Sequence, residues 1–146
     1  FTCLVGYCLP CCCACQQRKK LLHDDMSNYE CCAGIWGRSC TDNCNKCTKG
    51  NETCCLVLES FCCTGCAVHG NRWIVMQQYG LENDCCDVCI MWSSCICSVL
   101  ACLLQDENIA NLADVIYWVV LGCMLAQHEH QMKTFGYPVG HIQVMK

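Results

Sequence analysis

Apolar residues recur with the period of an α-helix near the end of this 146-residue chain. The clearest series has spacings of three and four residues and consists of Ile109, Leu112, Ile116, Val119, Val120 and Cys123. Such spacing places apolar side chains on one face of a helix. We therefore predict a helix from about residue 109 to residue 133, which ends before Gly136 and Pro138.

A second apolar stretch, residues 88 to 104, contains no charged side chain and predicts a helix over residues 86–104. The polar residues 105–108 between the two helices predict a turn, and their acidic side chains suit the N-terminal end of the next helix. We expect the two helices to form an antiparallel pair that supplies the core. The 17-residue stretch reaches the lower limit for a membrane span. Because acidic residues flank it at both ends, a buried core helix is the preferred interpretation.

The remaining pattern is less regular. Residues 16–29 are compatible with a short helix that has Leu21, Leu22 and Met26 on one side. Residues 31–55 are rich in Gly, Asn, Asp, Ser and Thr and predict a loop. Residues 71–79 predict a helix that ends at Gly80, and the stretch from Phe1 to Gln17 is interrupted by Pro10. The fold class is mainly α: a small Cys-rich helical domain with a C-terminal antiparallel helix pair, irregular Cys-rich loops and little or no β-structure.

Composition adds an abundance of cysteine, which accounts for 23 residues. This is far above the ~8–10 % that already indicates a cysteine scaffold. The odd number leaves at least one thiol free or paired with another chain. The net charge of −4 disfavours a nucleic-acid partner. Catalytic motifs are missing from the sequence, so we expect no enzyme activity and no defined small-molecule substrate.

The cysteines suit two different uses. Candidate disulfide or metal residues are the pairs with C-x-x-C spacing: Cys8/Cys11, Cys12/Cys15, Cys44/Cys47, Cys63/Cys66 and Cys86/Cys89. Two such pairs can complete a tetrahedral zinc site, although a random arrangement of this many cysteines gives roughly four pairs. Adjacent cysteines, as in Cys31-Cys32, have side chains that are expected to point apart. Each such doublet would then reach two different disulfide partners.

Further residues are candidates for a metal site or for glycosylation. Cys63, Cys66 and His69 have a spacing that offers three zinc ligands, against the interpretation of a polar residue that ends a Cys-rich turn. His128 and His130 face nearly opposite ways on a helix, and we expect them at a solvated helix end. Asn51 begins an Asn-Glu-Thr sequence, which is a glycosylation acceptor if the chain enters the secretory pathway.

The second part of the chain resembles the placenta-specific-eight family of Cys-rich proteins, which includes cornifelin and the plant cadmium-resistance and fruit-weight regulators. The resemblance covers about residues 54–138 and is carried by Cys54, Cys55, Cys62, Cys63, Cys66, Asn71, Arg72, Cys86, Asp87, Cys89, Cys95, Cys123, Gln127, Gly136, Tyr137 and Pro138. It implies a divergent member of the type found in microbial eukaryotes. The family implies membrane association and handling of divalent metals, and it implies no catalytic residue. A Cys-Thr-Gly-Cys run replaces the family's usual Cys-Pro-Cys.

The resemblance divides the chain into a Cys-rich region, residues 1–53, which matches only as a degenerate repeat, and a family-like helical domain, residues 54–146. Two functions remain open. The favoured hypothesis is a non-enzymatic, disulfide-stapled structural or interaction protein without a cofactor. It would self-associate or join an extracellular or cell-surface assembly. The alternative is a protein associated with the plasma membrane that binds or transports zinc or cadmium.

Overall fold

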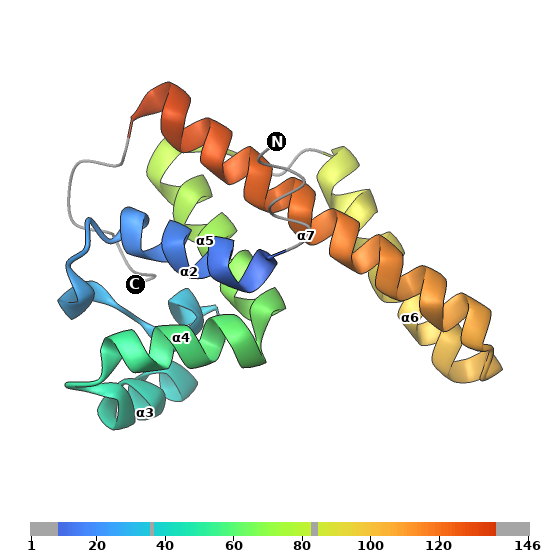
Figure 1. Cartoon of the computed structure of the whole chain (residues 1–146), viewed down its shortest axis with the longest axis horizontal. Coiled ribbons are helices and arrows are strands. Elements are labelled where there is room, and N and C mark those ends of the chain that lie inside the picture. The colour runs from blue at the N-terminus through green and yellow to red at the C-terminus, as the bar shows by residue number, and fades with distance from the viewer. Residues whose placement is uncertain (1–8, 36, 83–84, 137–146) are drawn as a thin grey trace.

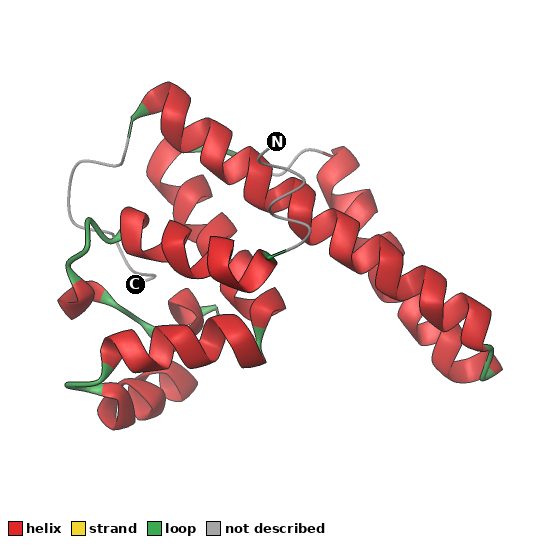
Figure 2. Cartoon of the chain, viewed as in Figure 1, coloured by secondary structure: helices red, strands yellow, loops and turns green. Residues whose placement is uncertain are grey.

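A computed structural model describes residues 9–35, 37–82 and 85–136, and this part of the chain is helical without strands (Figure 2). The mainly-α prediction is therefore confirmed. The elements in chain order are α2 (Pro10–Leu21), η1 (Met26–Asn28), η2 (Cys31–Gly34), α3 (Arg38–Thr48), α4 (Glu52–Cys62), α5 (Thr64–Tyr79), α6 (Cys85–Leu104) and α7 (Glu107–Phe135). Figure 1 shows a body built from α2 to α5 and the C-terminal half of α7, from which α6 and the start of α7 extend.

The predicted loop over residues 31–55 is wrong in most of its length, because α3 and the start of α4 occupy it. Short polar side chains compete for backbone hydrogen bonds and lower helix propensity. Here Thr41 instead donates its hydroxyl hydrogen to the carbonyl oxygen of Gly37, at 2.9 Å, inside the first turn of α3. The helix packs against η2, so tertiary contacts override the local preference.

The other boundaries follow local rules more closely. Helix α2 begins at Pro10, which occupies the first helical turn, where its missing N–H is no loss. Gly80 ends α5 in the left-handed conformation, with φ 61°, as predicted. Between α6 and α7, the Asp106 carboxylate accepts a hydrogen bond from the Asn108 backbone N–H at 2.8 Å. The two predicted C-terminal helices and the turn between them are thus confirmed.

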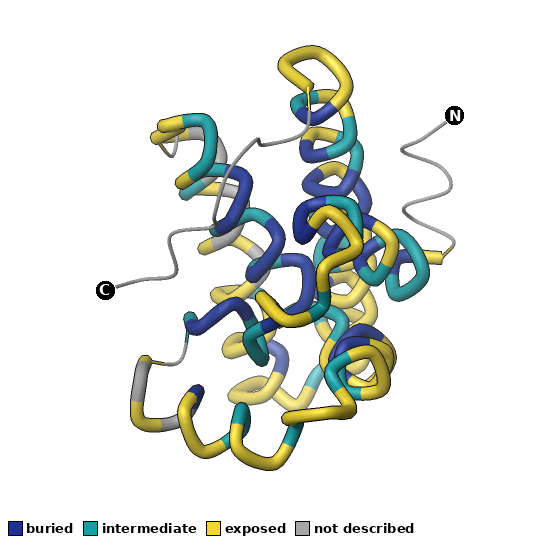
Figure 3. The backbone as a smooth tube through the Cα atoms, turned by 90° about the vertical axis from the view of Figure 1, so that its left-hand side faces the viewer, coloured by how far each residue is buried: buried dark blue, intermediate teal, exposed yellow. Residues whose placement is uncertain are grey.

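The prediction that this helix pair supplies the core is only partly right. The main apolar cluster joins α2, α5 and the C-terminal half of α7 through Ala14, Ala67, Val68, Leu121, Met124 and Leu125. Buried residues lie in the middle of the body, as Figure 3 shows. By contrast, Leu112 and Val119 are 55 % and 47 % exposed, and Cys123 is exposed as well. Helix α6 packs mainly on α7, away from the body, which leaves its outer face uncovered.

A buried charge connects the N-terminal helix to the rest of the body. Arg18 on α2 is 1 % exposed and forms an ion pair with Glu59 of α4, with 3.3 Å between Nη2 and Oε1. The same guanidinium group donates to the Asn71 side chain and to the backbone carbonyls of Glu30 and Ala67. Asn71 in turn donates to the carbonyl of Ala14 at 2.9 Å. Each contact joins segments distant in the sequence, so the charge is both neutralised and hydrogen-bonded.

Two residues next to the Arg18–Glu59 ion pair, Gly70 and Tyr29, accommodate it. A Cβ atom on Gly70 would collide with the Arg18 guanidinium group and would lie 3.2 Å from the Cys32 carbonyl oxygen. The glycine therefore provides the space in which α5 approaches α2. On the other side, the Tyr29 hydroxyl donates to Glu59 Oε2 at 2.7 Å, and burial together with the Glu59 charge strongly raises the pKa of Tyr29.

His128 was expected at a solvated helix end, but it is 3 % exposed on the inner face of α7. Both of its ring nitrogens lack a hydrogen-bond partner. Burial, with smaller contributions from Arg72 and His69, lowers the pKa of His128 to about 3. His130 is exposed, as the two-residue spacing predicts. The imidazole of His128 therefore packs as a neutral ring in the core.

Replacement of Arg18 tests whether the body depends on the ion pair. We expect Arg18→Met to lower the free energy of unfolding by about 3–5 kcal/mol, because Glu59 is left as an uncompensated buried charge. Denaturant unfolding followed by circular dichroism measures the loss.

The control Lys19→Met, on a half-buried neighbour in the same helix, should change the free energy of unfolding by less than about 0.5 kcal/mol. The double variant Arg18→Met/Glu59→Gln should lose less than the sum of the two single variants; additive losses would contradict a direct pair.

The buried imidazole makes stability depend on pH. A pKa of about 3 in the folded state lies below the ~6.5 of an unfolded histidine. Unfolding therefore takes up a proton, and stability falls as the pH drops from about 6.5 toward 3, with a loss of about 2 kcal/mol at pH 5. Urea unfolding between pH 7 and pH 5 should show a smaller loss for His128→Leu than for the exposed control His130→Leu. Equal slopes in both variants would contradict this assignment.

Candidate thiol–carboxylate site

No disulfide joins the cysteines that the structure describes. The Sγ atoms of the adjacent Cys31 and Cys32 are 3.9 Å apart, whereas a disulfide needs about 2.05 Å. The expectation that neighbouring side chains point apart is therefore wrong for this doublet. Cys32 adopts a left-handed backbone with φ 52°, which turns its side chain toward the same side as that of Cys31.

A carboxylate holds this backbone in place. The Cys32 backbone N–H donates to Glu59 Oε2 at 3.0 Å, on the oxygen that also accepts from Tyr29. Non-glycine residues rarely adopt positive φ, and such strain of about 1–3 kcal/mol persists only where surrounding contacts stabilise it. Ala33, which follows with φ 52°, is buried against Leu21, Ile74, Val75 and Met132. The buried network around Arg18 thus positions the two thiols.

Three potential ligand atoms converge at this point. The sulfur atoms of Cys31 and Cys32 and a carboxylate oxygen of Glu59 lie within 4.8 Å of one another. Among the described residues, this is the one group of three or more His, Cys, Asp and Glu side chains whose ligand atoms lie this close together. The residues come from η2 and α4, with 27 positions between Cys32 and Glu59. Side chains from separate elements therefore build the site.

The surroundings keep both thiols protonated. Burial is the largest cause that raises the pKa of Cys31, and the Glu59 charge adds to it. The pKa of Cys32 is raised more strongly, again by burial first and by Glu59 second. A cysteine nucleophile needs the opposite, a pKa lowered by positive charge or a helix N-terminus. The arrangement therefore disfavours thiolate catalysis, while a bound cation would replace the thiol protons.

The separation of the two sulfur atoms fits a tetrahedral metal ion. A Zn–S distance of about 2.3 Å places two sulfur ligands about 3.8 Å apart, close to the observed 3.9 Å between Cys31 and Cys32. Thiolate and carboxylate oxygen are both ligand types of zinc. Glu59 Oε2 already accepts two hydrogen bonds, so the carboxylate is held in one orientation. The donor set thus fits a zinc-like ion.

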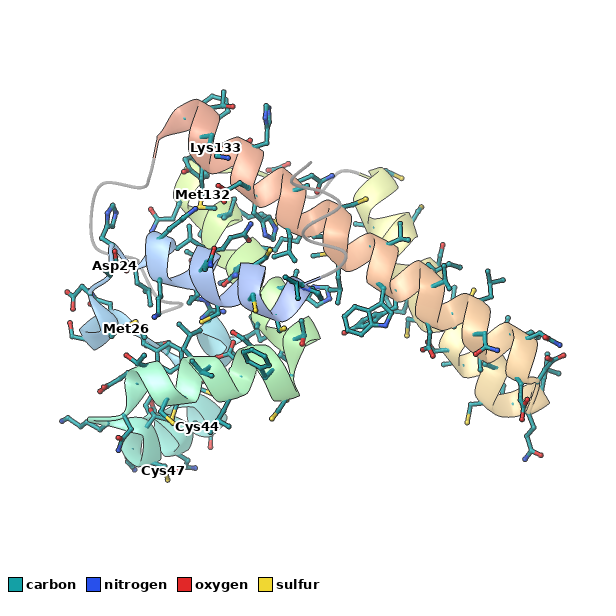
Figure 4. The ribbon with its side chains drawn as sticks, viewed as in Figure 1. Asp24, Met26, Cys44, Cys47, Met132 and Lys133 are labelled. Carbon is teal, nitrogen blue, oxygen red and sulfur yellow. The ribbon has the colours of Figure 1, made fainter. Side chains whose placement is uncertain are left out.

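Two of the predicted site residues flank this cluster. Cys44 of α3 contributes to the raised pKa of Cys31, and Cys66 of α5 contributes to that of Cys32. Figure 4 shows Cys44 on the side of α3 toward α4, whereas Cys47 lies farther from α4. Cys47, the partner of Cys44 in the predicted C-x-x-C pair, is thus not directed toward α4. Cys44 interacts with Cys31 from a separate helix, but it is not part of the group whose ligand atoms all lie within 4.8 Å of one another.

The other predicted cysteines lie on several helices. Cys11, Cys12 and Cys15 are half-buried on α2, Cys63 is exposed between α4 and α5, and Cys89 is exposed on α6. Cys8 lies outside the described residues, as does the side chain of Cys86. Asn51 is exposed directly before α4, where a glycosylation acceptor would be accessible. These assignments stay predictions.

The predicted zinc set of Cys63, Cys66 and His69 does not form a converging group comparable to that around Glu59. His69 lies on α5 one turn after Cys66, and its pKa is lowered by burial and by the nearby Arg72. This set also stays a prediction, with less support than the cluster at Cys31 and Cys32.

Sequence reasoning singled out the doublet Cys31-Cys32 but missed Glu59. One available signal was an acidic residue inside the apolar run from Leu56 to Phe61. A charged side chain on a helix face that is otherwise apolar is almost never fully buried unless it is paired. Its partner Arg18 lies 41 positions away, however, and no local pattern connects the two.

Comparisons with protein-family models, curated proteins and solved structures found no match to this chain. The resemblance to the placenta-specific-eight family therefore stays a prediction, and the function must be argued from the residues of the chain itself.

Proposed function

We propose that this chain is a non-enzymatic protein that binds a zinc-class divalent metal through Cys31, Cys32, Glu59 and Cys44. The observation that carries the proposal is the 3.9 Å separation of the Cys31 and Cys32 sulfur atoms beside a fixed carboxylate. The proposal corresponds to the second hypothesis drawn from the sequence, a protein that binds zinc or cadmium. Disulfide stapling receives no support from the described cysteines, none of which is at bonding distance from another.

The chemistry of the donors narrows the class of metal. Three sulfur atoms and one carboxylate oxygen form a soft donor set, which selects zinc or cadmium over magnesium or calcium. Such ligands must be reduced and deprotonated when they bind. A reducing compartment, such as the cytosolic side of a membrane, therefore suits this function better than the extracellular space.

The structure also bears on membrane association. Helix α7 is long and apolar enough to cross a bilayer by length and composition, while α4 and α5 pass the same criterion only as a pair bent by 114°. One such helix is weak evidence, because core helices of soluble proteins have the same properties. We therefore rest the proposal on the metal site alone.

Binding of Co²⁺ tests the metal site, because cobalt thiolate bonds absorb in the near ultraviolet. The reduced protein should bind an ion that Zn²⁺ displaces, and Cys31→Ser/Cys32→Ser should weaken that binding by about 100-fold, as loss of thiolate ligands removes most of the affinity. The matched control is Cys47→Ser/Cys54→Ser, two exposed cysteines outside the cluster, which should leave this ion bound.

The same preparation distinguishes the rival hypothesis. Intact mass after alkylation under denaturing, non-reducing conditions counts the free thiols. Nearly complete alkylation together with release of zinc would support metal binding. A deficit of mass from many disulfides, with no bound metal, would overturn the proposal in favour of a stapled structural protein. Equal loss of cobalt binding in both double variants would also contradict the assigned ligands.

A further inference from the structure

Cys31 and Cys32 direct two thiols to the same side of the chain, which adjacent cysteines within a helix do not do. Successive side chains of an α-helix differ in direction by about 100°. In the doublet Cys54-Cys55 of α4, Cys55 packs against a core cluster while Cys54 is exposed. The left-handed backbone of Cys32, with φ 52°, instead brings its sulfur atom to 3.9 Å from that of Cys31. The fold therefore builds a chelating dithiol here.

The separation of the two sulfur atoms suits an atom that bridges them better than a direct bond between them. A disulfide needs the sulfur atoms at about 2.05 Å and its Cα atoms usually about 4.4–6.8 Å apart. The Cα atoms of neighbouring residues are only about 3.8 Å apart across a trans peptide bond. A direct bond between Cys31 and Cys32 is therefore unfavourable, whereas one atom between the sulfur atoms closes a larger ring.

Trivalent arsenic is such a bridging atom, because it is soft, has three bonds in a pyramidal arrangement and binds sulfur strongly. Bonds as long as a zinc–sulfur bond, about 2.3 Å, place two sulfur atoms about 3.5 Å apart when they meet at an angle of roughly 100°. The observed separation of 3.9 Å is close to this value. Small rotations of the two side chains are therefore sufficient to form both bonds.

The product of this reaction is neutral, which suits the surroundings of the dithiol. Methylarsonous acid, CH3As(OH)2, exchanges two As–O bonds for two As–S bonds, and each hydroxyl group leaves as water with one thiol hydrogen. Arsenic stays trivalent, so no oxidant or reductant takes part. The Glu59 carboxylate beside the thiols is already paired with Arg18 and accepts from the Cys32 backbone N–H. A neutral adduct leaves the charges of this buried network matched.

We propose that Cys31 and Cys32 bind a trivalent arsenical through two bonds from their sulfur atoms to one arsenic atom. The inference rests on the proposed metal-binding function, because it uses two of the same ligands and extends their class from divalent ions to a metalloid. The arsenical needs only the two adjacent thiols, whereas the proposed divalent site also uses Glu59 and Cys44. Both cysteines are partly buried, so the small methyl compound is the suitable probe.

Titration of the reduced, metal-free protein with methylarsonous acid, followed by native intact mass, tests the inference. The first equivalent should add one CH3As group and remove two hydrogens. Cys31→Ser/Cys32→Ser should raise the dissociation constant of this equivalent by at least about 30-fold, because separate thiols lose the advantage of two linked bonds. The matched doublet Cys54→Ser/Cys55→Ser should retain it, and circular dichroism checks that both variants are folded. In the wild-type protein, one equivalent should protect Cys31 and Cys32 from alkylation under native conditions.

Binding of the first equivalent at another pair of thiols would overturn the inference. Cys12 and Cys15 lie about one turn apart on α2, and loss of this equivalent in Cys12→Ser/Cys15→Ser would identify them as the site. Cys44→Ser should weaken Co²⁺ binding and leave arsenical binding unchanged. If Cys31→Ser/Cys32→Ser loses cobalt but keeps the arsenical, only the inference fails. If it loses the arsenical and the wild-type protein binds no cobalt, the inference stands and the proposed function fails.

Discussion

The buried ion pair between Arg18 and Glu59 is the interaction on which the body of this protein depends. A guanidinium group at 1 % exposure is stable only if its charge and its N–H groups are matched. Its partners come from α4, α5 and the segment before η2. The Arg18 side chain therefore joins helix α2 to three other segments of the body, and Gly70 leaves the space that this side chain needs.

The same carboxylate connects the fold to the candidate site. Glu59 neutralises Arg18 with one oxygen and holds the Cys32 backbone and the Tyr29 hydroxyl with the other. The left-handed backbone of Cys32 brings two neighbouring thiols to 3.9 Å. A metal bound there would therefore be coupled to folding, because the groups that position its ligands also stabilise the core.

The apolar residues of the chain fall into two groups, one buried in the body and one exposed on the hairpin of α6 and α7. In the body, small and medium side chains such as Ala14, Ala67 and Leu125 fill the contact between helices. In the hairpin, large side chains such as Trp92 and Leu103 remain in contact with water, although exposed apolar surface is unfavourable.

The sequence by itself determined the elements that depend on neighbouring residues. Helices α6 and α7, the turn with Asp106 and the end of α5 at Gly80 follow from hydrophobic period and capping, which act within a few positions. Only the tertiary structure decided that α3 is helical, that Leu112 is exposed and that His128 is buried. It also decided that Cys31 and Cys32 meet Glu59. These features depend on contacts between residues far apart along the chain, and a local pattern shows which face of a helix is apolar but not what covers it.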